Sequence, residues 1–372
     1  MGNFDLLLQG FGTAFSMVNL LLAFAGGLMG LFVGAMPGVG AVTGVALLLP
    51  LTFKMNPTSA IIMLAGIYYG NMYGGAYSAI LLNIPGDSPA VMTALDGYPL
   101  SQKGKAGKAL FTANISSFIG GTFGIITLTI FGPLLADIGL KFGPAEITSL
   151  ILLALTSIGW LLGDDPLKGI AASALGILVS TIGIDTMAGG MGRYTFGTVN
   201  LLGGISFIPL VIGMFGLTQV MELMSDRKND SLTTGRRLTL RESLLDKSEI
   251  KRILPTAAKC SVLGNFVGFL PGAGGTTGSF LGYILEKKTG KHGKEMGKGV
   301  IEGVAASESA NNAAANGAFA PLLCLGIPGS ATTAVLLGGL MMWGLQPGPL
   351  LFTQQTEFVW GLIGSMYIGN VL

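Results

Sequence analysis

The chain has 372 residues, of which 50% are hydrophobic and only 11% are charged, and its net charge is +2. Soluble domains carry about a quarter charged residues, so this composition indicates an all-α polytopic membrane protein. It gives no reason to expect nucleic acid as a partner, because there is no basic stripe with interleaved aromatic residues. The 60 glycines suit helices whose backbones approach closely in lipid.

Two apolar stretches near the N-terminus, residues 13–33 and 41–53, are separated by a Pro-Gly break at residues 34–40. A span needs about 20 residues, so these stretches form either a re-entrant hairpin or two tilted spans. The next apolar run, residues 59–84, ends in a second break at Asn83-Ile84-Pro85-Gly86. Asp87 follows this break, where we expect it to cap the next helix.

Further hydrophobic segments are expected at residues 110–131, 145–162, 167–184 and 201–224. Asp96, before Gly97-Tyr98-Pro99, is expected to end a helix. The long polar segment Ser225–Arg252 holds eight Lys or Arg residues, which predicts a cytoplasmic linker. Its second part, Leu238–Ile253, has apolar residues at near-helical spacing and suits a helix on the membrane surface. We therefore divide the chain into a first unit with its following helices (1–224), the linker (225–252) and a second unit (253–372).

The second unit repeats the two breaks of the first. Pro271 lies 234 positions after Pro37, and the glycines and threonines around them match at the same offset. Pro328 lies 243 positions after Pro85, again within a Pro-Gly motif. Two motifs in the same order indicate one folding unit used twice. Paired Pro/Gly breaks in two halves are typical of transporter binding sites, although each break alone also suits a packing glycine or a kink.

The basic loops predict that the two units have opposite orientations. The second unit carries five lysines at residues 287–298, whereas the equivalent loop at residues 51–58 has Lys54 alone. Conversely, the Lys103–Lys108 loop corresponds to residues 343–356, which have no Lys or Arg. Under the positive-inside rule, this swap is what inverted-topology repeats with discontinuous or re-entrant helices produce.

A helix that restarts after a Pro-Gly break presents free N–H groups and a positive dipole end, which bind anions. The small and polar residues at the four breaks are therefore the candidate substrate-binding residues, although interhelical hydrogen bonding would also place Ser, Thr and Asn there. They are Pro37, Gly38, Gly40, Thr43, Asn83, Pro85, Gly86, Ser88, Pro271, Gly272, Gly274, Thr276, Thr277, Pro328, Gly329, Ser330 and Thr332.

The candidate residues for a coupling ion are Asn71, Glu308, Asn311 and Asn312. Glu308 lies inside an apolar segment, and ionisable residues there are functional candidates by default. If the ion is H⁺, Glu308 is the first candidate; if it is Na⁺, Asn311 and Asn312 with freed carbonyls supply oxygen ligands. Glu302 lies nearer the interface and is expected to cap a helix or pair with a loop. No cofactor is expected, and with one histidine, His292, and no nucleophile or zinc motif, the sequence does not predict an enzyme.

Several of these stretches together resemble one family. They are Met36-Pro37-Gly38-Val39-Gly40, Asn83-Ile84-Pro85-Gly86-Asp87, Asp96-Gly97-Tyr98-Pro99, Glu302-Gly303-Val304-Ala305, Glu308-Ser309-Ala310-Asn311-Asn312 and Gly326-Ile327-Pro328-Gly329-Ser330. Across nearly its whole length the chain resembles the TctA family, the large membrane subunit of tripartite tricarboxylate transporters. The resemblance implies uptake of a di- or tricarboxylate or an aromatic acid across the bacterial inner membrane, driven by an ion gradient. It also implies two partners, a small membrane subunit and a periplasmic solute-binding protein.

The sequence thus predicts a multi-pass, ion-coupled secondary transporter of carboxylates such as citrate. The alternative is an uncoupled anion channel that uses the same helix dipoles. The chain ends inside a hydrophobic segment that opens near Phe358, so we expect the natural protein to continue beyond Leu372.

Overall fold

The computed structural model describes residues 3–36, 39–157, 166–185, 191–205 and 243–372, together with residues 209, 210, 213, 214, 217, 220, 221 and 224. Its first part forms α1 (Asn3–Ala14), α2 (Met17–Ala35), α3 (Gly40–Leu48), α4 (Pro57–Leu82), α5 (Ala90–Leu100) and α6 (Ala106–Gly139). Then follow α7 (Pro144–Ser157), α8 (Pro166–Ser180) and a small antiparallel pair, β1 (Gly183–Asp185) and β2 (Met191–Arg193). The last part forms α11 (Lys247–Phe269), α12 (Gly274–Thr289), α13 (Ile301–Gly317), α14 (Phe319–Leu325), α15 (Ala331–Met342), α16 (Leu351–Gln354) and α17 (Thr356–Val371).

The predicted all-helical character is confirmed for the described residues, apart from β1 and β2. Part of the expected segment 201–224 and all of 225–242 lie outside the described residues. Residues 238–242 of the surface helix expected at 238–253 also lie outside the described residues. From Lys247 onwards the chain forms α11, which begins with a capping box between Asp246 and Glu249 and continues to Phe269.

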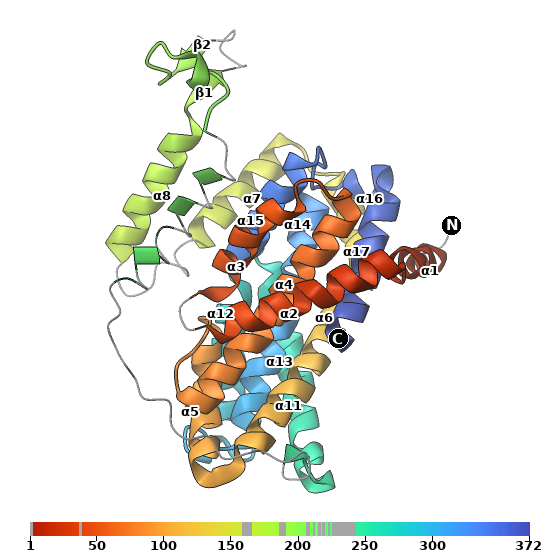
Figure 1. Ribbon diagram of the computed structural model, residues 1–372, viewed down its shortest axis with the longest axis vertical. Coiled ribbons are helices and arrows are strands. Elements are labelled where there is room, and N and C mark those ends of the chain that lie inside the picture. The colour runs from red at the N-terminus through yellow and green to blue at the C-terminus, as the bar shows by residue number, and fades with distance from the viewer. Residues whose placement is uncertain are drawn as a thin grey trace.

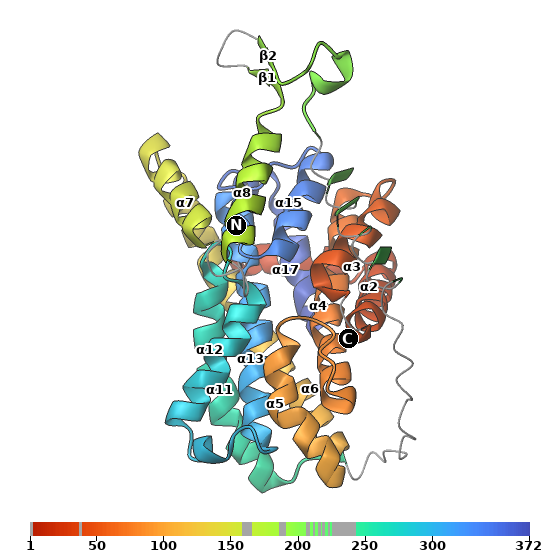
Figure 2. The ribbon, with the colours of Figure 1, turned by 90° about the vertical axis from the view of Figure 1, so that its left-hand side faces the viewer.

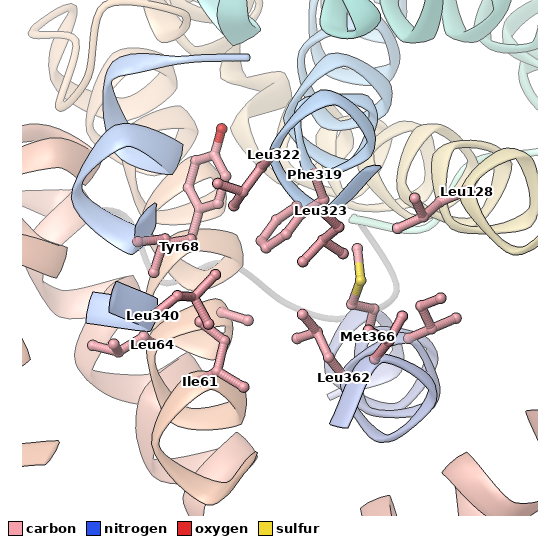
Figure 3. Close-up of a cluster of buried hydrophobic side chains, with 14 of the residues drawn as sticks. Ile61, Leu64, Tyr68, Leu128, Phe319, Leu322, Leu323, Leu340, Leu362 and Met366 are labelled. Atoms are coloured by element: carbon pink, nitrogen blue, oxygen red, sulfur yellow. The ribbon is translucent and has the colours of Figure 1, made fainter. Parts of the chain in front are cut away.

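Helix α13 is the centre of the bundle (Figures 1 and 2). All of its residues, Ile301–Gly317, are buried, which suits a segment rich in Ala, Gly, Ser and Asn that other helices approach closely. An apolar cluster continues the core beyond it, and Figure 3 shows that Tyr68 of α4, Phe319 of α14 and Leu362 of α17 belong to it. Helices α7 and α8 and the two strands lie to one side of and above this bundle in Figure 2.

Two helix pairs, α2 with α4 and α11 with α13, pack in the same register. A Cβ added to Gly30 on α2 would lie 2.2 Å from the carbonyl oxygen of Ile67. A Cβ added to Gly264 on α11 would lie 2.2 Å from the carbonyl oxygen of Ala310. Gly264 is 234 positions after Gly30, and Ala310 is 243 positions after Ile67, so the contact recurs at the offsets of the sequence motifs. The same recurrence relates the contact of Gly34 with Asn71 to that of Gly268 with Ala314.

The equivalent helices of the two pairs run in opposite directions. In Figure 1, α4 descends from the α3 end toward α5, whereas α13 rises from the lower loop toward α14. The two basic loops meet at the lower end, where Lys103 Nζ donates a hydrogen bond to the carbonyl oxygen of Lys298. At the same end, Lys108 Nζ lies 2.7 Å from Glu249 Oε1. Positive charge from both units is therefore collected on one side of the molecule.

Within the part of the chain that the structure describes, two helical stretches are long and apolar enough to cross a bilayer by length and composition, Met17–Ala35 and Ala90–Gly139.

Candidate functional site

The helix breaks meet inside the bundle and are joined by hydrogen bonds between segments distant in sequence. The Gly274 N–H donates to the Gly329 carbonyl oxygen over 3.1 Å, which joins the two breaks of the second unit. The Ser279 hydroxyl, one turn into α12, donates to the Pro89 carbonyl oxygen of the first unit over 2.9 Å. We call this region, residues 39–41, 83–89, 270–276 and 326–330, the break junction. The predicted residues Pro37 and Gly38 lie outside the described residues.

Asp87 caps a helix of the break junction, but not the one expected from the sequence. Its Oδ2 accepts the backbone N–H of Ala41, in the first turn of α3, over 3.0 Å. Its Oδ1 accepts the adjacent Ser88 N–H over 2.7 Å. The expectation that Asp87 caps the helix after it was therefore wrong, because the free N–H groups of α3 lie within reach of the carboxylate. The positive end of α3 is thus already occupied by a carboxylate of the chain itself.

Several other predicted residues have local structural roles. Asn83 has φ 59°, in the left-handed region, and ends α4; Gly326, with φ 70°, ends α14 at the equivalent position. Ser330 caps α15, and its side chain accepts the Thr333 N–H over 3.2 Å. A Cβ on Gly86 would lie 1.8 Å from the carbonyl oxygen of Gly34, so only glycine fits there.

Burial divides the remaining predicted substrate residues. Those that are buried are Thr43, Pro271, Gly274, Gly329 and Thr332. Those that are half-buried are Gly40, Pro85, Gly272, Thr277 and Pro328, whereas the side chains of Ser88 and Thr276 are exposed.

The four candidate coupling-ion residues separate into two groups. Asn71 on α4 and Asn311 on α13 are buried, and the Oδ1 of each has no hydrogen-bond partner among the described residues. Asn311 Oδ1 faces α12, since a Cβ on Gly275 would lie 2.4 Å from it. Asn311 therefore belongs to the break junction. Glu308 and Asn312 lie elsewhere, because Ser117 donates to Glu308 and lines a cavity together with Asn312. Asn311 and Asn312 thus face different surroundings although they are neighbours in sequence.

Glu308 is only 1% exposed and is held by hydroxyl groups. Its Oε1 accepts a hydrogen bond from Thr93 of α5, and its Oε2 accepts one from Ser117 of α6 over 3.0 Å. Thr93 Oγ1 also lies 3.0 Å from the Ser307 hydroxyl. No Lys, Arg or His of the described chain forms an ion pair with Glu308. An unpaired buried carboxylate surrounded by hydroxyl oxygens can exchange a proton or bind a hard cation.

A cavity of about 440 Å³ lies beside Glu308, bounded by α2, α4, α6, α13 and α17. Ser117 both lines this cavity and donates to the Glu308 carboxylate. The other polar side chains of its wall are Tyr69, Tyr73, Tyr77, Asn114, Asn312 and Asn370. Apart from Asn312, these residues were not predicted from the sequence, where the available signal was the spacing of four between the three tyrosines, which places them on one face of α4.

Two further carboxylates of the described chain have structural partners. We expected Asp96 to end a helix, but α5 continues past it to Leu100. Its carboxylate accepts N–H groups from the loop before α13 and the hydroxyl of Tyr283 over 2.8 Å. Glu302 pairs with Arg252 over 2.7 Å and 2.9 Å and with His292 Nδ1 over 2.8 Å, as expected for a loop-pairing residue. Groups of three or more His, Cys, Asp or Glu side chains that could hold a metal ion are absent from the described residues.

The fold and the break junction define an all-α protein in which loops between helices meet in the interior. The model of the tripartite tricarboxylate transporter TctA family matches residues 20–372, and the chain belongs to this family. TctA proteins are the large subunit of these transporters, so the chain is a transporter component.

Two proteins of Agrobacterium vitis are similar to this chain. An uncharacterized 52.8 kDa protein in the TAR-I ttuC' 3' region is 42% identical over 363 residues, which cover 98% of this chain and 72% of that protein. An uncharacterized protein in the TAR-II ttuC' 3' region is 49% identical over 109 residues, which cover 29% of this chain and 45% of that protein. No solved structure matches the chain.

Proposed function

We propose that this protein is the membrane subunit of a transporter that imports organic carboxylates, such as citrate or another di- or tricarboxylate. An ion gradient drives this import. A periplasmic solute-binding protein would deliver the substrate, and a small membrane subunit would complete the transporter in the bacterial inner membrane. The observation that carries the proposal is the break junction, where breaks from both units meet in the interior. Irregular backbone within a membrane is tolerated where it is buried in protein or lines a cavity, as at transporter binding sites.

The packing of the two units supports an inverted repeat. The helix pairs α2–α4 and α11–α13 share a packing register, and α4 and α13 run in opposite directions (Figure 1). Both basic loops lie at one end of the bundle, where Lys103 contacts Lys298. The positive-inside rule assigns that end to the cytoplasm. In this arrangement the break junction lies between the two units, so a movement of one unit against the other would expose it to either side.

Glu308, together with Thr93 and Ser117, is our proposed coupling site. Its carboxylate and the hydroxyls of Thr93 and Ser117 supply hard oxygen ligands, which suit Na⁺, and the same carboxylate can carry H⁺. The cavity lined by Ser117 and Asn312 gives the ion a route to this carboxylate. Because α13 carries both Glu308 and Asn311, a change at the coupling site is transmitted to the break junction through a single rigid helix.

Uptake into proteoliposomes tests this function. The complete transporter would be reconstituted with its small subunit, the binding protein added outside, and uptake of radiolabelled citrate and a carboxylate panel compared under a Na⁺ gradient, a pH gradient and no gradient. Saturable uptake that depends on one gradient supports a coupled transporter and identifies the ion. Passive equilibration that ignores both gradients supports the uncoupled anion channel instead.

A further inference from the structure

A pocket opens at the end of the bundle where the basic loops meet, away from the break junction. Its volume is about 360 Å³, and its walls come from the N-terminal part of α11, the C-terminal end of α12, the loop that follows and the first turn of α13. Its walls hold four cations and two carboxylates, which are Lys251, Arg252, Lys259, Lys291, Glu286 and Glu302. The pocket therefore carries net positive charge, which favours an anion as its ligand.

Ion pairs within the pocket leave part of this positive charge without a partner. Arg252 donates through Nε and Nη2 to Glu302, and Lys259 Nζ lies 2.7 Å from Glu286 Oε2. Both carboxylates are buried, so they fix these two cations in place. The other two lysines of the pocket form no ion pair among the described residues, and Arg252 Nη1 has no acceptor there. Ammonium and guanidinium donors of this kind bind phosphate groups.

An exposed apolar stripe continues from the pocket along α11, which lies at the outer edge of the bundle in Figure 2. Lys251 and Lys259 share one face of this helix with Val262 and Phe266, because the successive spacings are eight, three and four residues. Val262 and Phe266 are 56% and 62% exposed. At a rise of 1.5 Å per residue, Phe266 lies about 10 Å further along the helix than Lys259. A cationic pocket and an apolar surface thus follow one another on the same helix face.

We propose that the pocket binds the headgroup phosphate of an anionic phospholipid, with an acyl chain of the same lipid against Val262 and Phe266. The phosphate accepts hydrogen bonds from Lys251, Lys291 and Arg252 Nη1. An anionic headgroup matches the net charge of the pocket, and the apolar stripe provides a contact that a free anion could not use. The lipid would link α11 to the end of α12 and its loop, whichever substrate the protein carries.

The test compares two lipids with identical acyl chains, dioleoylphosphatidylglycerol and dioleoylphosphatidylcholine, and uses inorganic phosphate as a third probe. The affinity of each probe for the purified protein in a neutral detergent is obtained from the rise in unfolding temperature with probe concentration. We expect the anionic phosphatidylglycerol to bind at least about tenfold more tightly than phosphatidylcholine. Equal affinities of the two lipids would overturn the inference. Inorganic phosphate that binds as tightly as phosphatidylglycerol would also overturn it, because the site would then be one for free anions.

Matched charge variants show whether the pocket is the site. Lys251→Gln/Lys291→Gln removes the two unpaired lysines of the pocket, whereas Lys288→Gln/Lys294→Gln removes two lysines near the same loop that do not line it. All four side chains are exposed, so both variants should unfold at the wild-type temperature without lipid. The pocket variant should bind phosphatidylglycerol at least about tenfold more weakly than the control variant, since each lysine contributes about fivefold. Equal affinities of these variants would contradict the assignment of the pocket.

A second pair of variants tests the apolar stripe. Phe266→Ala on α11 is compared with Phe280→Ala on α12, because Phe280 is also exposed but does not line the pocket. The affinity for phosphatidylglycerol should fall severalfold in Phe266→Ala and stay at the wild-type value in Phe280→Ala. Equal affinities would overturn the proposed position of the acyl chain. Loss of phosphatidylglycerol binding on assembly with the small membrane subunit would show that the subunit covers the stripe, and would refute the lipid site.

Discussion

Substitution of Gly30 by alanine tests the register in which α2 packs on α4. The added Cβ would lie 2.2 Å from the Ile67 carbonyl oxygen, whereas real Cβ atoms essentially never approach within 3.0 Å of a neighbour. The Ile67 carbonyl oxygen is a backbone atom of a buried turn of α4, so it cannot rotate away from the added Cβ as a side chain could. Helix α2 must therefore move away from α4 by about 1 Å. Such overpacking costs about 1–3 kcal/mol.

The control is Gly27→Ala on the same helix, where an added Cβ meets nothing within 4 Å. Both substitutions gain about 1 kcal/mol of helix propensity, so the difference between the two variants isolates the packing cost. We expect Gly30→Ala to be about 1–3 kcal/mol less stable than Gly27→Ala, which corresponds to a fall of several degrees in unfolding temperature. The assay is thermal unfolding of the purified protein in detergent.

Equal unfolding temperatures for these two variants would refute the packing register. The repeat makes the test stricter, because Gly264→Ala places its Cβ 2.2 Å from the Ala310 carbonyl oxygen. Its cost should match that of Gly30→Ala. A tolerated Gly264→Ala beside a damaging Gly30→Ala would show that the two helix pairs are not equivalent.

Three further predictions concern the polar end of the bundle. Asp96→Ala should lower the free energy of unfolding by about 3–5 kcal/mol, because several buried donors lose their acceptor. Tyr283→Phe removes only one of these donors and should lower it by about 1 kcal/mol. Equal losses for the two variants in thermal unfolding would contradict this. A double-mutant cycle of Arg252→Gln and Glu302→Gln should give a coupling of only about 1 kcal/mol, since Arg252 is 40% exposed, and a value that salt does not reduce would argue against the ion pair. The Ser248 hydroxyl, followed by the Glu249 N–H, lowers the pKa of Asp246 below its ordinary value of 3.8. Its cap on α11 should therefore stabilise the protein above pH 3.8 and be lost as the pH falls through the lowered pKa, and Asp246→Ala should flatten that dependence in unfolding measured against pH.

The repeated breaks could be predicted because proline and glycine act locally. Pro-Gly motifs at Pro37 and Pro271 interrupt apolar helices whatever surrounds them, and the matching offsets then identify equivalent helices. The placement of Glu308 in an apolar segment could also be predicted, because it depends only on the neighbouring residues in the chain. The class of fold followed from composition alone, because so few charged residues cannot cover a soluble surface.

The contacts of the site could not be predicted, because they join distant segments. Asp87 caps α3 across 46 residues, and Ser117 reaches Glu308 across 191. A carboxylate after a break suits its own helix equally well in sequence terms, so only the tertiary packing decides. Helical spacing separates Asn311 from Asn312 and places Asn312 with Glu308, but which segments each side chain meets depends on the tertiary packing.

The most direct test of the account is the steady-state accumulation of a radiolabelled carboxylate by proteoliposomes that contain either the wild-type transporter or Glu308→Gln. Under an inward ion gradient, we predict that wild type concentrates the substrate above its external level. Glu308→Gln keeps the shape of the side chain but cannot exchange a proton or hold a cation by charge, so it should only equilibrate the substrate. Accumulation by Glu308→Gln equal to that of wild type would contradict the assignment of Glu308 as the coupling group.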